Sequence, residues 1–264
     1  MASGKTSKRA RSARTVAVTQ RTIPWGTIIA TAVVLLFAAG VLGYAIVQQR
    51  AKSVATAAVA AFTPSETNQD PSKAIPGVVT AAFVGGKHVL PTDRVAYTHS
   101  PPFGGAHEFS WAACSGVVYP KPVRNENMVH SLEHGAVWIA YDPTKISGDQ
   151  LAQLRRRVDG EQYTMLSPYP GLDQPISLQS WGHQLKLSDP ADVRIDQFIQ
   201  ALRVNRFTHP EPGASCDALG PGQFDQDNPP PFDPKPPGPG AVPENGKPVG
   251  TASGEQLQNP TPTR

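Results

Sequence analysis

The feature that most limits the fold of this 264-residue chain is an apolar run near its N-terminus. Residues 25–47 are 23 consecutive positions without a charged side chain. A helix rising about 1.5 Å per residue would be about 34 Å long here, enough to cross a hydrocarbon core of roughly 30 Å. We therefore expect one transmembrane helix over residues 25–47. A cleaved signal peptide is the alternative, although its apolar region usually has roughly 7–15 residues.

The charges that flank this run predict its orientation. Six basic residues and no acidic residue precede it, whereas Arg50 and Lys52 are the two basic residues that follow closely. Because cytoplasmic flanks carry the excess of Lys and Arg, residues 1–24 are expected to be a basic cytoplasmic tail. The protein is then a single-pass protein of the cell membrane, with its N-terminus in the cytoplasm and its C-terminal domain extracytoplasmic.

The rest of the chain divides by composition. Residues 48–75 are rich in Ala, Ser and Thr and predict an extension of the helix followed by a linker, and residues 76–217 suit one ordinary domain. Residues 218–264 are expected to be a disordered tail, because 14 of the 28 prolines lie between Pro210 and the C-terminus. The net charge of +3 is modest, with much of the positive charge near the N-terminus, so we expect no nucleic-acid partner.

Local patterns predict a small α+β domain, because helices and strands alternate without a strict βαβ order. Apolar alternation around Gly85 and Gly86 predicts a hairpin over residues 77–90. Residues 125–134 are expected to form a short helix, and residues 136–141 a buried strand. Further helices are expected over residues 147–160 and from residue 189 to residue 202, and further strands over residues 163–166 and 176–187.

The two cysteines, Cys114 and Cys216, both fall on the side predicted to be exported. An oxidising compartment favours a disulfide between them. Such a bridge closes about 100 residues, and the chain-entropy model gives it about 4–5 kcal/mol. Two unpaired thiols are the alternative, whereas a redox-active C-x-x-C site is not present in the sequence.

Histidines provide the candidate chemistry. His130 and His134 are four residues apart, so both imidazoles lie on one face, and imidazole is a ligand for zinc and copper. His107 ends a loop rich in Pro and Gly, and we expect it, or else His88, to supply a third ligand. The predicted site is therefore His107, His130 and His134 around copper or zinc, with Glu133 pointing away. Histidines that only donate to backbone carbonyls are the alternative.

The segment from His130 to His134 also matches the H-x-x-E-H motif of zinc peptidases, in which Glu133 would be the general base. Gly135 and an apolar strand follow at once, which makes the helix short for that chemistry. Motifs of other enzyme classes, such as a nucleophile elbow, a phosphate loop or a dinucleotide fingerprint, do not occur. We expect a non-enzymatic envelope module that binds a metal or a protein partner, with a zinc-dependent hydrolase as the alternative.

Residues 100–107, with the sequence SPPFGGAH, and residues 125–139, with VHSLEHG, are the most distinctive stretches of the domain. The first resembles the PP-x-GG-x-H loop, and the second the most characteristic stretch, of the actinobacterial family called domain of unknown function 3105. The resemblance covers roughly residues 75–217. It implies a membrane-anchored, exported domain, supports a bridge between Cys114 and Cys216, and implies no reaction.

Overall fold

The computed structural model describes residues 24–220 and 222–246 of the chain. Residues 1–23, which make up nearly all of the predicted basic tail, and residues 247–264 of the predicted disordered tail lie outside the described residues. The chain divides into two compact units, residues 1–53 and residues 54–264.

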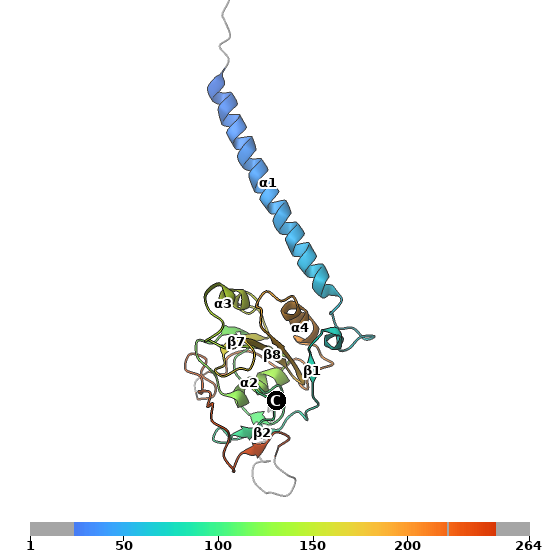
Figure 1. Ribbon diagram of the computed structural model, residues 1–264, viewed down its shortest axis with the longest axis vertical. Coiled ribbons are helices and arrows are strands. Elements are labelled where there is room, and N and C mark those ends of the chain that lie inside the picture. The colour runs from blue at the N-terminus through green and yellow to red at the C-terminus, as the bar shows by residue number, and fades with distance from the viewer. Residues whose placement is uncertain (1–23, 221, 247–264) are drawn as a thin grey trace, which may run out of the picture. The chain divides into compact units, whose positions relative to one another are not determined.

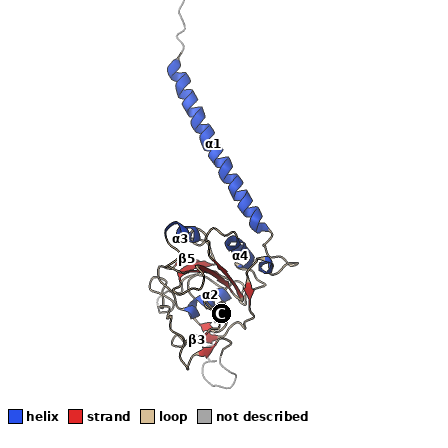
Figure 2. Ribbon diagram, in the orientation of Figure 1, coloured by secondary structure: helices blue, strands red, loops and turns tan. Residues whose placement is uncertain are grey.

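Apart from helix α1, most of which lies in the first unit, helices and strands are mixed along the second unit (Figures 1 and 2). The helices are α1 (Trp25–Ala60), the 3-10 helix η1 (Pro71–Ala74), α2 (Asn125–Glu133), α3 (Gly148–Arg155) and α4 (Arg194–Leu202). The strands are β1 (Val79–Thr80), β2 (His88–Val89), β3 (Val95–Ala96), β4 (His107–Glu108), β5 (Ser115–Val118), β6 (Val137–Tyr141), β7 (Thr164–Pro168), β8 (Ile176–Ser180), β9 (His183–Leu187) and β10 (Val242–Pro243). This mixture in one small domain confirms the predicted α+β class.

Helix α1 contains the predicted apolar run. Its segment Trp25–Arg50 has a mean hydropathy of 2.3 and is long and apolar enough to cross a membrane, by length and composition. The helix continues to Ala60 because the Ala-rich sequence that follows favours helix and has no breaker. The rest of the predicted linker is partly packed, since Ile75 is buried in a core cluster of the domain.

A six-stranded sheet forms the centre of the domain, in the order β1-β9-β8-β6-β7-β5. The pairs β1/β9, β9/β8 and β8/β6 are antiparallel, whereas β6/β7 and β7/β5 are parallel. Strand β6 lies inside the sheet and all of its residues are buried, as predicted for residues 136–141. Predicted helices over residues 125–134, 147–160 and 189–202 correspond to α2, α3 and α4, although α3 ends earlier and α4 begins later.

The two faces of β6 belong to two apolar clusters. Trp138 and Ala140 share a cluster with the apolar residues of α2. Val137 and Ile139 share the other cluster with the apolar residues of α3 and α4. Because successive side chains of a strand point to opposite faces, α2 covers one face of the sheet and α3 and α4 cover the other (Figure 1). Burial on both faces explains why β6 is apolar throughout.

The prediction of a disordered tail is wrong for residues 222–246, which pack on the domain. Strand β10 pairs in parallel with β3, and the Arg124 N–H donates to the Pro230 carbonyl at 2.9 Å. Phe224 is 1% exposed, and its ring centroid lies 6.1 Å from that of Tyr119. Proline keeps such a segment extended, and widely spaced apolar residues between the prolines supply the buried contacts.

The predicted hairpin over residues 77–90 is also wrong. Strand β1 pairs with β9, and β2 pairs with β4, so the two halves of this segment belong to different sheets. Apolar alternation indicates extended backbone, but it does not specify the partner strand.

The predicted disulfide between Cys114 and Cys216 is present, and both residues are buried. The Cys114 N–H also donates to the Cys216 carbonyl at 2.8 Å. The bridge joins positions 102 residues apart and thereby ties the segment after α4 to the start of β5.

Candidate metal centre

A short parallel pairing brings the first two histidines together. The register of β2 and β4 places His88 opposite His107, and their ring centroids are 4.9 Å apart. The His107 N–H donates to the Lys87 carbonyl at 2.9 Å. Two segments that are distant in the chain therefore form one side of a histidine cluster.

Close contacts hold the loop that precedes His107. A Cβ atom at Gly104 would lie 2.2 Å from the ring of Phe83. Gly105 has a φ of +98°, and a Cβ atom there would lie 2.7 Å from the Glu244 carbonyl oxygen. The backbone N–H of Ala106 donates to the same Glu244 carbonyl at 2.6 Å. Glycine is required at both positions, and the packed C-terminal segment helps to aim His107.

Helix α2 supplies the remaining side chains. His130 and Glu133 lie three residues apart in its last turn, and His134 is its C-cap. Residues at this spacing are neighbours on the surface of a helix. Gly135 follows with a φ of +92° and ends the helix, and a Cβ atom there would lie 2.7 Å from the ring of His209.

Four of these side chains form what we call the inner group: His88, His107, His130 and Glu133. Their ligand atoms all lie within 4.8 Å of one another. The ring centroid of His130 is 4.7 Å from that of His107 and 5.1 Å from that of His88. His88 is exposed and the other three are buried, so the group is open to solvent on the side of His88.

Backbone carbonyls orient three of the rings. Their Nδ1 atoms donate to carbonyl oxygens in the pairs His107–Gly105 (2.8 Å), His130–Glu108 (2.7 Å) and His134–Ser215 (2.6 Å). Because a carbonyl oxygen only accepts, each Nδ1 carries the proton, and each neutral ring keeps a lone pair on Nε2. Metal-binding histidines commonly show this arrangement. Purely structural histidines would show it as well, so the surroundings of the Nε2 atoms distinguish the two interpretations.

Two buried polar atoms face each other in the inner group. His107 Nε2 lies 2.7 Å from Glu133 Oε2, and both side chains are 0% exposed. The angles at this contact do not fit a hydrogen bond, so the two atoms form at most an ion pair, and among the described residues neither has a hydrogen-bond partner. The other Glu133 oxygen, Oε1, accepts the Gly86 N–H at 2.6 Å. Buried polar atoms are rarely left without partners, so these two atoms fit the coordination of a cation.

The surroundings also set the protonation states of the group. Burial, together with the neighbouring His107, lowers the pKa of His88. Burial lowers the pKa of His130 as well, and the rings of His107 and His134 add to this shift. Burial alone would raise the pKa of Glu133, but the contact with His107 outweighs it and the pKa is lowered. A neutral imidazole and an ionised carboxylate are the forms that bind a metal.

A second set of ligand atoms, which we call the outer group, consists of His130, His134 and Glu211. These atoms also lie within 4.8 Å of one another, and His134 Nε2 is 3.4 Å from Glu211 Oε2. The side chain of Glu211 is 43% exposed, whereas that of His134 is 3% exposed. The outer group therefore reaches solvent through its carboxylate.

His107, His130 and His134 were predicted to form one site, but the structure divides them between two groups of ligand atoms that share His130. His107 and His134 each lie beside His130, but they belong to different groups. Glu133, expected to point away, is a member of the inner group, because its spacing from His130 puts it on a neighbouring position of the helix. The sequence around Glu211 has no periodicity that would place its carboxylate near α2.

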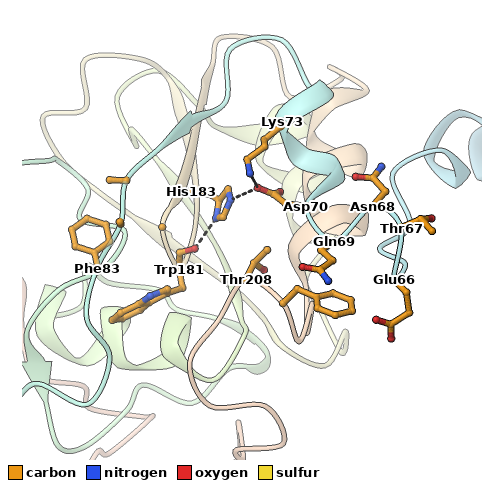
Figure 3. Close-up of a pocket in the computed structure, with 14 residues that line it drawn as sticks. Glu66, Thr67, Asn68, Gln69, Asp70, Lys73, Phe83, Trp181, His183 and Thr208 are labelled. Carbon is orange, nitrogen blue, oxygen red and sulfur yellow. Dashed lines mark hydrogen bonds and ion pairs between the residues drawn. The ribbon is translucent and has the colours of Figure 1, made fainter.

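A surface pocket of about 630 Å³ is lined by none of the inner-group residues (Figure 3). Trp181 lines the pocket, and its ring centroid is 5.9 Å from that of His107. Inside the pocket, His183 Nε2 lies 3.1 Å from Asp70 Oδ2 (Figure 3). Among the described residues this pair does not belong to a group of three or more ligand-type side chains. The pocket is therefore a weaker candidate for a metal site.

Residues 88–218 match the family described as a protein of unknown function, DUF3105. This range contains every member of the inner and outer groups and both cysteines. The domain that contains residues 88–218 therefore belongs to the DUF3105 family, as its sequence resemblance predicted. No curated protein and no solved structure matches it.

Proposed function

We propose that this protein is a membrane-anchored module of the cell envelope that binds one zinc or copper ion in the inner group. The observation that carries the proposal is the buried pair of His107 Nε2 and Glu133 Oε2, which lack hydrogen-bond partners among the described residues. They lie in a cluster with a ring nitrogen of His130 and with His88 at its open side. Three imidazoles and one carboxylate would hold the ion.

The donor set suits these two metals. Imidazole is a common ligand of zinc and copper, and a carboxylate completes many such sites. Zinc–ligand bonds of about 2.0–2.1 Å keep tetrahedral ligand atoms about 3.3 Å apart. The four atoms of the inner group lie within 4.8 Å of one another, so an ion would have to draw them together by at most about 1.5 Å.

The zinc-hydrolase alternative is weaker because Glu133 is already engaged. As a general base it would need a free oxygen to take a proton from water on the metal. Its Oε1 accepts the Gly86 N–H, and its Oε2 would itself be a ligand of the ion in the inner group, so no oxygen is left to take the proton. The motif also occupies the last turn of α2, which has nine residues, and not the middle of a long helix.

Two observations support the proposed location. The helix α1 has the length and composition of a membrane span, and the basic residues before it favour a cytoplasmic N-terminus. The buried disulfide between Cys114 and Cys216 is typical of an oxidising compartment.

Metal titration of the full-length protein in detergent micelles tests the proposal. We expect one zinc or copper ion per chain, measured by elemental mass spectrometry after dialysis against buffers of defined free metal concentration. The variant His107→Gln should weaken binding about 100-fold, because loss of a ligand costs at least as much as loss of its supporting contacts. The exposed ligand gives a second variant, His88→Gln, which should weaken binding without disturbing the buried core.

His99→Gln is the matched control, because His99 belongs to neither group among the described residues. It should leave metal affinity unchanged. Circular dichroism of each variant reports whether the fold is retained. A wild-type protein that takes up neither ion, or equal affinities for all three variants and the wild type, contradicts the proposal.

A further inference from the structure

His130 stands between two sets of ligand-type side chains. Its ring centroid is 4.7 Å from that of His107 and 4.6 Å from that of His134. Glu133 completes the set on the first side and Glu211 the set on the second. The two groups are therefore joined through one imidazole.

This imidazole can serve one ion at a time. His130 Nδ1 donates to the Glu108 carbonyl at 2.7 Å, which leaves Nε2 as its single metal-binding atom. His134 is arranged in the same way, because its Nδ1 donates to the Ser215 carbonyl at 2.6 Å. An ion bound to His130 Nε2 is thus shared with the inner group or with the outer group, but two ions cannot both use this atom.

We infer that the outer group, His130, His134 and Glu211, is a second and weaker position for the same metal ion, occupied in alternation with the inner group. The inference rests on the proposed function. An ion in the outer group is also bound to His130, which is a member of the inner group. Such an ion can pass to the inner group by exchanging His134 and Glu211 for inner ligands while its bond to His130 is kept.

Burial and ligand number rank the two positions. The outer group offers three ligand atoms, and its carboxylate is 43% exposed. The inner group offers four, and the side chains of His107 and Glu133 are 0% exposed. Fewer ligands and greater access to water predict weaker binding and faster exchange at the outer position. The inner group also opens to solvent beside His88, so equilibrium binding, and not the loading rate, distinguishes the positions.

The test is to replace Glu133, the carboxylate of the inner group, and to measure whether the protein still binds a metal ion. Full-length protein in detergent micelles is dialysed against zinc ion at a series of free concentrations, and bound zinc is counted by elemental mass spectrometry. The wild type should bind one ion. Glu133→Gln, which changes no outer ligand, should still bind one ion, with a dissociation constant about 100-fold higher. Adding Glu211→Gln to Glu133→Gln should abolish binding in the same concentration range.

Glu161→Gln is the matched control for Glu211→Gln, because the side chain of Glu161 is also exposed, pairs with Arg203 at 3.1 Å and belongs to neither ligand group among the described residues. Added to Glu133→Gln, it should leave the residual site intact. A Glu133→Gln protein that binds no zinc, or whose residual binding is the same with and without Glu211→Gln, overturns the outer position. Two ions per wild-type chain overturn the alternation. A wild type that binds neither zinc nor copper contradicts the proposed function instead.

Discussion

Asp70 is a half-buried carboxylate whose charge is stabilised by its neighbours. Its Oδ2 lies 3.1 Å from His183 Nε2 (Figure 3). Its Oδ1 accepts the Ser72 hydroxyl at 2.5 Å. Lys73 Nζ lies 3.4 Å from Asp70 Oδ2. Burial alone would raise the pKa of Asp70, but the hydrogen bonds from His183 and Ser72 outweigh it, and the pKa is lowered well below its usual range. The ionised side chain therefore stabilises the folded domain at neutral pH.

We predict that Asp70→Asn lowers the free energy of unfolding by about 2 kcal/mol at pH 7, because charge-assisted hydrogen bonds contribute about that much. The pKa of Asp70 is lower in the folded state than in the unfolded chain, where it is about 3.9. The contribution is therefore present above pH 4 and is lost as the pH falls through the folded pKa. Urea unfolding followed by tryptophan fluorescence at several pH values measures the difference.

The exposed Asp159 provides the control for this prediction. Asp159→Asn should change the free energy of unfolding little at any pH, as is usual for surface substitutions. If wild type and Asp70→Asn differ as much at pH 2 as at pH 7, the stabilising role of the charge is contradicted.

Spacing along a helix predicts the ligand positions that α2 supplies, and no others. His130 and His134 share a face, and their ring centroids are 4.6 Å apart. The same geometry at a spacing of three residues places Glu133 beside His130, contrary to the prediction that Glu133 points away. The position of His107 depends on a strand pairing with residues 88–89, which helix geometry does not address.

At the scale of elements, the end of α2 is fixed by one glycine. Gly135 has a φ of +92°, and its N–H donates to the Leu132 carbonyl at 3.0 Å. Its Cα faces the ring of His209, whose Nδ1 lies 3.1 Å from the Glu133 carbonyl. The turn between α2 and β6 thus needs both a left-handed backbone and space that a Cβ atom would fill.

We predict that Gly135→Ala destabilises the domain by at least about 1 kcal/mol more than Gly160→Ala. Both glycines have positive φ, so both variants carry the backbone strain, which costs about 1–3 kcal/mol. A Cβ atom at Gly160 would meet nothing within 4 Å, whereas at Gly135 it would lie 2.7 Å from the buried His209 ring. Urea unfolding of the two variants isolates this contact. Equal losses of stability would show that the His209 ring moves aside without cost.

Short strand pairings are the part of the element structure that the sequence left open. Strand β6 is an apolar run long enough to be predicted, and α2 has a clear stop at Gly135. By contrast, β2, β4 and β10 contain two residues each and pair with distant segments. Their stability comes from tertiary contacts, such as the cluster that joins Val89, Val95 and Val242, and not from local propensity.

At the scale of the whole domain, segments after α4 support both ligand groups. The Ser215 carbonyl that orients His134 is next to Cys216, which is bonded to Cys114. Farther along, the Glu244 carbonyl accepts the backbone N–H that precedes His107. The predicted domain boundary at residue 217, which was based on proline content, therefore separates segments that pack together. Composition predicts whether a segment can form a core of its own, but it does not reveal a few buried residues that attach a long segment to a neighbouring core.

The orientation of the chain in the membrane is the prediction that bears on the whole protein. Basic residues before α1 and few after it predict a cytoplasmic N-terminus. Alkaline phosphatase fused after residue 60 should be active, because it folds with its disulfides outside the cytoplasm, and green fluorescent protein exported unfolded at that position should be dark. Fusions after residue 24 are the control and should show the opposite pattern, since that position precedes the apolar run. Active phosphatase at residue 24 with fluorescence at residue 60 would reverse the orientation and place the disulfide-bonded domain in a reducing compartment.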